Sequence, residues 1–440
     1  MIKKWLYKEI SIAPLISFRV LFGFLMSFSI GRFYAKGWIE ECYVKPTYFF
    51  SYYGFDWLPA PSVEGIYLIY FLLFIFSLGI AFGALYRISS ISFFLLFTYV
   101  ELIDKTYYLN HYYFVSIIAF LLIWVPANQA FSIDSKLWPS IKAKIVPAWS
   151  INIFKLQLAI VYFFAGIAKL QSDWLLNAMP LKIWLPAKSN TPIIGSLLQE
   201  EWIAYAFSWG GAIYDLTIVF FLLYAPTRIL AFAAVIVFHL LTAALFQIGM
   251  FPYIMIIASL IFFSAEWHEK IHAYFTNKTR VNNDVGTSKS LAFQKPILSI
   301  LGVFLIMQIL LPVRHLAYPG NLFWTEQGYR FSWRVMLMEK TAFTTFIVKD
   351  SKSEKVDFVD NTKYLKPQQE KMMSTQPDMI LQFAHYIGQQ YEEKGFEQVE
   401  VYCNSKLSLN GRRSKIYIDP KVDLMKEQRG FNHKKWIVEE

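Results

Sequence analysis

The sequence predicts a polytopic α-helical membrane domain of about nine spans, followed by a small α+β domain. Of the 440 residues, 56% are hydrophobic and only 17% are charged, which is too apolar for an ordinary soluble protein. Long apolar stretches recur up to about residue 311, and the density of charged residues rises sharply after it. We therefore expect a transmembrane domain at 1–311 and a second domain at 312–440.

Nine apolar stretches are candidate membrane spans. They are Pro14–Ile30, Gly65–Leu85, Ser89–Ile103, Tyr112–Trp124, Ser150–Lys169, Ala204–Tyr224, Arg228–Ala244, Ile248–Phe263 and Pro296–Leu311. Several are shorter than the ~20 residues that cross a bilayer unaided. We therefore expect some spans to be tilted or re-entrant, and the count to vary by one or two. A short polar helix, Lys3–Glu9, precedes the first span, and an aromatic loop, Gly31–Glu64, follows it.

Basic residues set the expected orientation. The net charge is +10, which in a membrane protein favours basic cytoplasmic loops beside anionic lipid over nucleic-acid binding. With the N-terminus inside, the cytoplasmic segments hold more Lys and Arg than the outer loops do. Nine spans then place the second domain outside the cytoplasm, on the outer side of a bacterial inner membrane or in the lumen of the endoplasmic reticulum. The two cysteines, Cys42 and Cys403, are too few for a disulfide framework or a zinc site, although they could pair with each other.

The second domain has both strand and helix patterns. Thr341–Lys349, Lys355–Val359, Gln398–Leu407 and Ser414–Ile418 are predicted strands, and Asp378–Lys394 is a predicted amphipathic helix. Asn410-Gly411 is a typical hairpin turn between the last two strands. These elements predict a small α+β domain.

Polar residues within or beside apolar spans cost free energy, so each is expected to have a structural or functional role. The set is Glu101, Asp104, Lys105, Asn110, His111, Lys169, Asp215 and His239. Lys169 ends one span and His111 begins another, and the expected topology places both on the outer side. An amine in apolar surroundings is easier to keep neutral, and a neutral amine can accept a proton.

Each of these residues also has a structural interpretation. A lysine at a helix end commonly extends to the lipid headgroups, and Asp173 lies four residues after Lys169, where it could pair with the amine. A lone His239 on an apolar helix is more often bonded between helices than a ligand. Asp104 and Lys105 could form an interfacial ion pair. No GxSxG, Walker, HExxH, CxxC or GxGxxG pattern is present, so the residues alone indicate a membrane protein with an outward polar site.

Four stretches resemble the vitamin K-dependent γ-glutamyl carboxylases and the bacterial relatives that share their membrane domain, the HTTM family. They are IDKTYYLNHYYF, VYFFAGIAKLQSDWL, FHLLTAALFQIGMFPYIMI and QGYRFSWRVML. The resemblance covers nearly the whole chain, and the motifs occur in the family's order. It implies an enzyme that couples oxygenation of reduced vitamin K (phylloquinol or menaquinol) to the addition of CO2 to a protein glutamate. It implies O2 and CO2 as co-substrates, a peptide or protein partner, and no metal.

The resemblance also implies roles for individual residues. Lys169 corresponds to the family's base, and His111 to a histidine that stabilises charge in the reaction. Asn110, Asp104, Lys105 and His239 are candidates for shaping the quinol pocket. The glutamate-binding region corresponds to Tyr329–Met338, in which Tyr329, Trp333 and Arg334 are the candidates.

The chain departs from the family pattern at several positions. Ala168 replaces a second lysine before the base, Gln129 replaces a histidine, and Arg334 replaces an acid. The chain is also shorter than the animal enzyme. Two other functions therefore stay open: a quinol epoxidase that does not carboxylate protein, and a non-catalytic membrane protein that binds a lipid or peptide.

Overall fold

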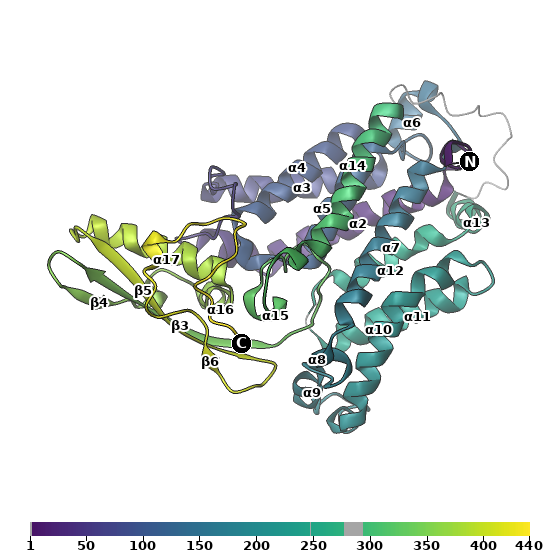
Figure 1. Ribbon diagram of the computed structural model, residues 1–440. Coiled ribbons are helices and arrows are strands. Elements are labelled where there is room, and N and C mark those ends of the chain that lie inside the picture. Colours follow the sequence, from purple (N-terminus) through teal and green to yellow (C-terminus); the bar gives the residue numbers. More distant parts are fainter. Residues whose placement is uncertain (1, 247, 277–293) are drawn as a thin grey trace.

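The computed structural model describes residues 2–246, 248–276 and 294–440, and it has two parts (Figure 1). A bundle of long helices forms the first part, and an antiparallel sheet with two helices forms the second. The basic segment 277–293, with the sequence Asn277-Lys278-Thr279, lies outside the described residues. The expected fold class, a helical membrane domain followed by a small α+β domain, is confirmed.

Seven helices of the described chain are long and apolar enough to cross a membrane. They are α2 (Ala13–Ala35), α3 (Val63–Phe82), α4 (Tyr86–Ile103), α7 (Trp149–Lys169), α10 (Glu201–Leu223), α11 (Arg228–Leu245) and α14 (Gln294–Val313). A bent pair, α12 (Phe251–Ser259) and α13 (Ala265–Thr276), could raise the count to eight; the angle between its arms is 111°. The remaining expected stretch is α5 (Asn110–Trp124), an apolar helix of only 15 residues. The predicted stretches that do not form one full-length span in the structure are among the shorter stretches predicted from the sequence.

Short elements connect the long helices. The expected helix at the N-terminus is α1 (Ile2–Leu6), and it ends earlier than predicted because Glu9–Ser11 forms β1, which pairs antiparallel with β2 (Ile145–Pro147). The remaining short helices of this part are η1 (Glu40–Val44), η2 (Lys105–Tyr107), α6 (Ile133–Leu137), η3 (Pro139–Ile141), α8 (Ser172–Leu175), α9 (Leu181–Trp184), η4 (Pro186–Lys188), η5 (Leu197–Gln199), η6 (Leu260–Phe262), η7 (Arg314–Ala317) and α15 (Leu322–Thr325). The loop after Lys169 is therefore ordered into short helical turns.

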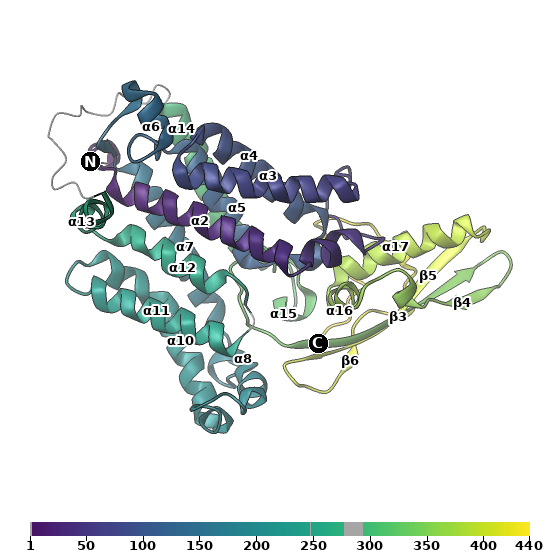
Figure 2. The same ribbon diagram turned by 180° about the vertical axis from the view of Figure 1, so that it is seen from behind.

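Helix α2 runs through the bundle between α3 and α12 (Figure 2). Its contact with α3 is very close at Gly23, where an added Cβ would lie 2.4 Å from the backbone nitrogen of Ala81. Ser27 of α2 and Ser77 of α3 join their hydroxyls at 2.8 Å one turn further on. Small residues let two membrane helices approach closely, and interhelical hydrogen bonds then hold them together.

The second part is a four-stranded antiparallel sheet of order β4-β3-β5-β6. Its strands are β4 (Val356–Phe358), β3 (Lys340–Asp350), β5 (Val399–Leu409) and β6 (Lys415–Ile416), and its helices are α16 (Pro367–Thr375) and α17 (Pro377–Glu393), with the turns η8 (Asn361–Lys363) and η9 (Leu424–Lys426). Four strands and α17 match the predicted ranges to within a few residues, whereas α16 was not predicted. Asn410 and Gly411 have φ of 52° and 73°, so they form the predicted hairpin turn.

The aromatic loop after α2 links the two parts. Phe50 is fully buried in the core of the sheet domain, where it packs against Phe383, and its carbonyl accepts the Lys105 backbone N–H at 2.9 Å. Helix α14 packs against the helical core through Leu301 and its partly buried neighbours, whereas most of its other side chains are exposed. Cys42 and Cys403 are both free, since Cys403 lies in the core of β5 and Cys42 in the loop after α2.

Gly23→Ala should destabilise the bundle, because the added Cβ would collide with the backbone of α3. Overpacking of this kind costs about 1–3 kcal/mol. Gly31→Ala in the same helix is the matched control, because nothing lies within 4 Å of its Cβ position. Thermal unfolding in detergent should therefore show a lower midpoint for Gly23→Ala alone, and equal midpoints for the two variants would contradict the close contact.

Candidate active site

Lys169 and Asp215 form a buried ion pair inside the bundle. The Lys169 Nζ lies 2.6 Å from the Asp215 Oδ2, and it also donates to the Ala165 carbonyl at 3.3 Å. Both residues are only 6% exposed. The pair joins the last turn of α7 to the middle of α10, and these two helices pack along each other. Lys169 therefore points into the protein and does not extend to the headgroups.

Asp173, the partner that sequence spacing suggested for Lys169, binds the sheet domain instead. It accepts a hydrogen bond from the Asn410 Nδ2 at 2.8 Å and forms an ion pair with Arg412. Pairing with Lys169 at (i, i+4) requires a continuous helix, but α7 ends at Lys169 and a new turn, α8, begins at Ser172. The structure thus excludes the Lys169–Asp173 pair that the spacing allowed, and it shows that Asp173 fastens the β5–β6 hairpin to the membrane domain.

A cavity of about 100 Å³ surrounds the Lys169–Asp215 pair. Its walls come from α7, α10, α11, α12 and the segment that leads into the sheet domain. Aromatic and aliphatic side chains dominate them, including Tyr162, Trp174, Trp184, Phe207, Phe238, Phe246, Phe251 and Met255. The Trp174 ring lies 5.7 Å from the Lys169 Nζ, close enough to attract the charged amine. The ion pair therefore sits in a small, mostly apolar chamber.

Two further candidates, His239 and Trp333, lie in the same chamber. The His239 Nε2 is 3.1 Å from the Tyr162 hydroxyl, while its Nδ1 has no hydrogen-bond partner among the described residues. Trp333 is 1% exposed, stacks on Tyr113 at 5.0 Å, and its Nε1 likewise has no partner within the described chain. Buried ring nitrogens are normally hydrogen-bonded. These two therefore offer contacts to an oxygen-bearing molecule in the cavity.

His111 lies next to this chamber rather than in its lining. It is 6% exposed at the start of α5 and has no hydrogen bond to any other described residue. A Cβ on Gly249 would lie 3.4 Å from its Nε2, so glycine allows that turn to approach the imidazole. The ring of Phe251, which lines the cavity, lies 6.1 Å from His111 and 5.8 Å from His239. Phe251 therefore lies within ring-contact distance of both imidazoles.

Tyr329, Arg334 and Asn110 form a separate polar group beside Trp333. The Arg334 carbonyl accepts hydrogen bonds from the Asn110 Nδ2 at 3.0 Å and from the Tyr329 hydroxyl at 3.3 Å. The Arg334 guanidinium lies 3.1 Å from the His315 ring. None of these three residues lines the Lys169 cavity. They hold the segment that carries Trp333 against α5.

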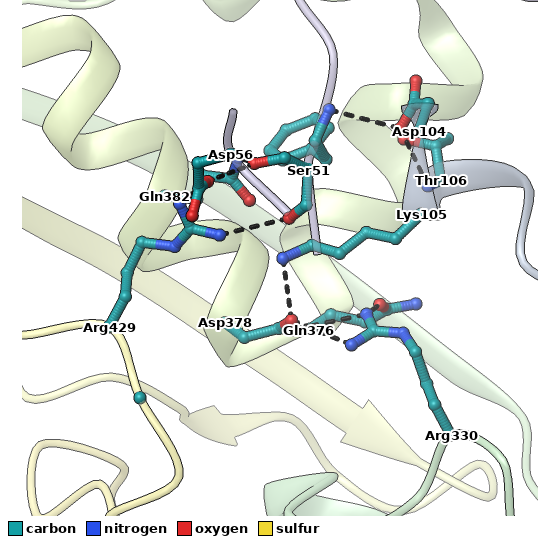
Figure 3. A network of polar contacts seen from close by, with 12 residues as sticks. Ser51, Asp56, Asp104, Lys105, Thr106, Arg330, Gln376, Asp378, Gln382 and Arg429 are labelled. Atoms are coloured by element: carbon teal, nitrogen blue, oxygen red, sulfur yellow. Dashed lines mark hydrogen bonds and ion pairs between the residues drawn. The ribbon is translucent and has the colours of Figure 1, made fainter. Parts of the chain in front are cut away.

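Asp104 and Lys105 lie at the junction between the two domains (Figure 3). The Lys105 Nζ and the Arg330 guanidinium both bind the Asp378 carboxylate of α17, each at 2.8 Å. Asp104 accepts the side-chain amide of Gln369 at 3.0 Å, from α16. Burial would raise the pKa of the Asp378 carboxyl, but the two cations hold it well below its usual range. The structure thus places Asp104 and Lys105 in an interdomain network and not in the lining of the Lys169 cavity.

Sequence reasoning singled out Asp215 as an intramembrane carboxyl but did not pair it with Lys169. Charged groups in apolar segments usually pair with one another, and this rule could have predicted the Lys169–Asp215 pair. Tyr162, Trp174 and Phe251 carried no signal, because aromatic residues are common throughout this chain. Among the described residues, no group of three or more His, Cys, Asp or Glu side chains could hold a metal ion.

Asp378→Asn should weaken the interdomain junction, because it leaves the buried Lys105 and Arg330 without their carboxylate. Removing one partner of a fully buried pair costs about 3–5 kcal/mol. The Asp378 side chain is 34% exposed, so we expect the smaller loss of about 2 kcal/mol in the free energy of unfolding.

Glu397→Gln is the control for this variant, because its pair with Lys352 is exposed on both sides. Denaturant unfolding in detergent should separate the two variants. The parent protein should lose the same stability on acidification, but only below about pH 4. A carboxyl whose pKa is depressed in the folded state contributes stability that is present above its unfolded pKa and is lost as the pH falls below that value. Equal stability of the two variants would show that the network is not a structural tie.

Two family models match the chain. The HTTM domain matches residues 7–267, and the vitamin K-dependent gamma-carboxylase lumenal domain matches residues 293–440. No solved structure matches the chain. The two models follow one another in the same order as the helical bundle and the sheet domain, and the second begins at the start of α14. The chain belongs to the vitamin K-dependent gamma-glutamyl carboxylase family.

Proposed function

We propose that the protein is a vitamin K-dependent γ-glutamyl carboxylase of the membrane, and that Lys169 is its base. The observation that carries the proposal is the Lys169 amine in an apolar chamber, with Asp215 at 2.6 Å and two unpartnered ring nitrogens in the walls. A base must lie within hydrogen-bond reach of the proton that it removes, and it must be able to lose its own proton. The Asp215 carboxylate, at 2.6 Å, is the acceptor for that proton.

The chamber fits a reduced quinone by the chemistry of its walls. Aromatic side chains suit a flat apolar ring, the amine suits an acidic ring hydroxyl, and the unpartnered nitrogens of His239 and Trp333 suit its oxygens. When bound, the quinol together with O2 would supply the strong base that removes the γ-proton of a glutamate, after which CO2 adds. We infer this chemistry from the family to which the chain belongs.

The residues of this chain have three tasks in the proposal. Lys169 receives the hydroxyl proton as one of its own ammonium protons passes to the Asp215 carboxylate, so that the pair takes up one proton in all. The apolar walls exclude water, which would otherwise protonate a carbanion beside a carboxylate. His111, an imidazole behind Phe251, would stabilise negative charge at the edge of the chamber.

We infer that the glutamate peptide approaches from the sheet domain, on the non-cytoplasmic side. The segment that carries Trp333 leads from the cavity wall directly into β3 of that domain. The description of the matching family as a lumenal domain supports this side of the membrane. Tyr329 and Arg334 flank this route and are the proposed contacts for the peptide. The membrane is then a bacterial inner membrane or the endoplasmic reticulum.

One observation favours a second candidate, a quinol epoxidase without protein carboxylation. Arg334 replaces an acid of the family pattern, and its guanidinium is engaged with His315 on the peptide route. This change affects the proposed peptide contact and leaves the Lys169 chamber intact. The epoxidase would therefore share the quinol chemistry and differ only in its acceptor.

Purified protein in detergent should convert reduced vitamin K to its epoxide and fix labelled bicarbonate into a short glutamate peptide. Lys169→Ala should abolish both products, because no other amine lies in the chamber lining. Lys155→Ala, in the same helix but away from that lining, is the matched control and should retain activity. Epoxide without fixed label would select the epoxidase. If the folded protein formed neither product, the non-catalytic binding protein would be the better interpretation. Full activity of Lys169→Ala would refute the assignment of Lys169 as the base.

Asp215→Asn should lower the turnover number about 10- to 100-fold and leave a measurable rate. The amide keeps the shape of the side chain but cannot take the proton that Lys169 passes on, an effect of about 1.4–3 kcal/mol. The Michaelis constant for the quinol should change little, because the lost interaction forms mainly as the proton moves. An unchanged turnover number would show that Asp215 has only a structural role.

A further inference from the structure

A second and larger cavity, of about 330 Å³, lies at the junction of the two domains. Membrane helices α2, α3, α4 and α5 contribute to its walls, together with η1 and η2, and Gln368 and Met372 of α16 close it from the sheet domain. It shares no lining residue with the Lys169 cavity. The mechanism proposed above makes no use of it.

The walls of this cavity are aromatic. Trp38, Tyr43, Tyr70, Tyr107 and Tyr112 are among its lining residues. The face of an aromatic ring attracts a cation that lies within about 6 Å of its centre. The same cluster already does so at its edge, where the Arg32 Cζ lies 4.9 Å and the Lys36 Nζ 5.8 Å from the Trp38 ring centre.

Among the described residues, a single carboxyl lines this aromatic cavity, that of Glu101 in the last turn of α4. Within the described parts of the chain, its side chain has no hydrogen bond or ion pair. Other acids of the membrane domain differ, since Asp104, Asp134, Asp173 and Asp215 all have polar partners. A carboxylate in apolar surroundings is unfavourable unless an opposite charge compensates it. Glu101 is therefore available to pair with a cation from outside the described chain.

We propose that this cavity binds an organic ammonium group, with Glu101 as its counter-ion and the rings as its walls. A carboxylate together with several aromatic faces is the combination that recognises a methylated or alkyl ammonium. A metal ion fits less well, because the cavity offers one carboxyl where calcium or magnesium takes six or more oxygens. This proposal does not rest on the carboxylase function.

Two sources supply this chemistry, and they enter the cavity differently. One is the choline or ethanolamine headgroup of a lipid, which the position at the end of the membrane helices favours. The other is a soluble amine. In both cases Met372 and Gln368 contact the ligand from α16, so its binding would tie the sheet domain to the helical bundle.

Calorimetric titration of the full-length protein in a maltoside detergent tests the soluble source. Choline should bind to the parent protein at least tenfold more tightly than 3,3-dimethylbutan-1-ol, its uncharged analogue, and Glu101→Gln should remove this preference. Glu64→Gln is the matched control, because Glu64 is an exposed acid at the start of α3.

Native mass spectrometry of protein from nanodiscs tests the lipid source. A retained phosphatidylethanolamine or phosphatidylcholine that Glu101→Gln loses, in preference to phosphatidylglycerol, identifies a headgroup.

Cys42 provides a test that needs no variant. Its thiol lines the same cavity, whereas Cys403 is buried in the sheet domain and serves as an internal reference. Choline or the retained lipid should slow maleimide labelling of Cys42 and leave Cys403 unchanged. The proposal would be overturned if choline and its uncharged analogue bound equally well, or if Glu101→Gln bound choline as tightly as the parent protein does. It would also be overturned if the protein bound neither a lipid headgroup nor a soluble amine.

Discussion

The cost of charge in an apolar interior governs the arrangement of the membrane domain. Lys169 and Asp215 lie on different helices, and neither would be stable at this depth without the other. Their contact at 2.6 Å joins α7 to α10 and forms part of the lining of a chamber whose other walls are mostly apolar. The same pair that stabilises the packing therefore places an acid and a base side by side in the chamber lining.

A second level of organisation lies at the junction of the domains. The Lys105–Asp378–Arg330 network and the Asn110–Arg334 hydrogen bond lie on opposite sides of the short segment that carries Trp333. Trp333, Phe331 and Met336 have φ between 55° and 61°, an uncommon conformation for bulky side chains. The surrounding contacts maintain it. Of the residues proposed to shape the quinol pocket, Asn110, Asp104 and Lys105 thus position one wall, whereas His239 lines the chamber itself.

The sequence predicted the fold well where the signal was local. Apolar length identified every long helix, alternation identified the strands, and Asn410-Gly411 identified the hairpin turn. What escaped prediction depends on residues that are distant in the chain. Lys169 and Asp215 are separated by 46 positions, so no local pattern joins them, and the nearer Asp173 was the partner that spacing suggested. Helix α16 is short and polar, and its burial against the loop at Phe50 is visible only in three dimensions.

The hairpin at Asn410 has a consequence for how such proteins diverge. Its Asn410 and Arg412 bind Asp173, which follows Lys169 by only four residues. The tip of the outer sheet and the amine of the inner chamber are thus connected through a single short turn. A recombination event that exchanged one domain for that of a distant relative would separate Asp173 from its two partners and would disturb the end of α7. The two domains are consequently expected to be inherited together, as one evolutionary unit.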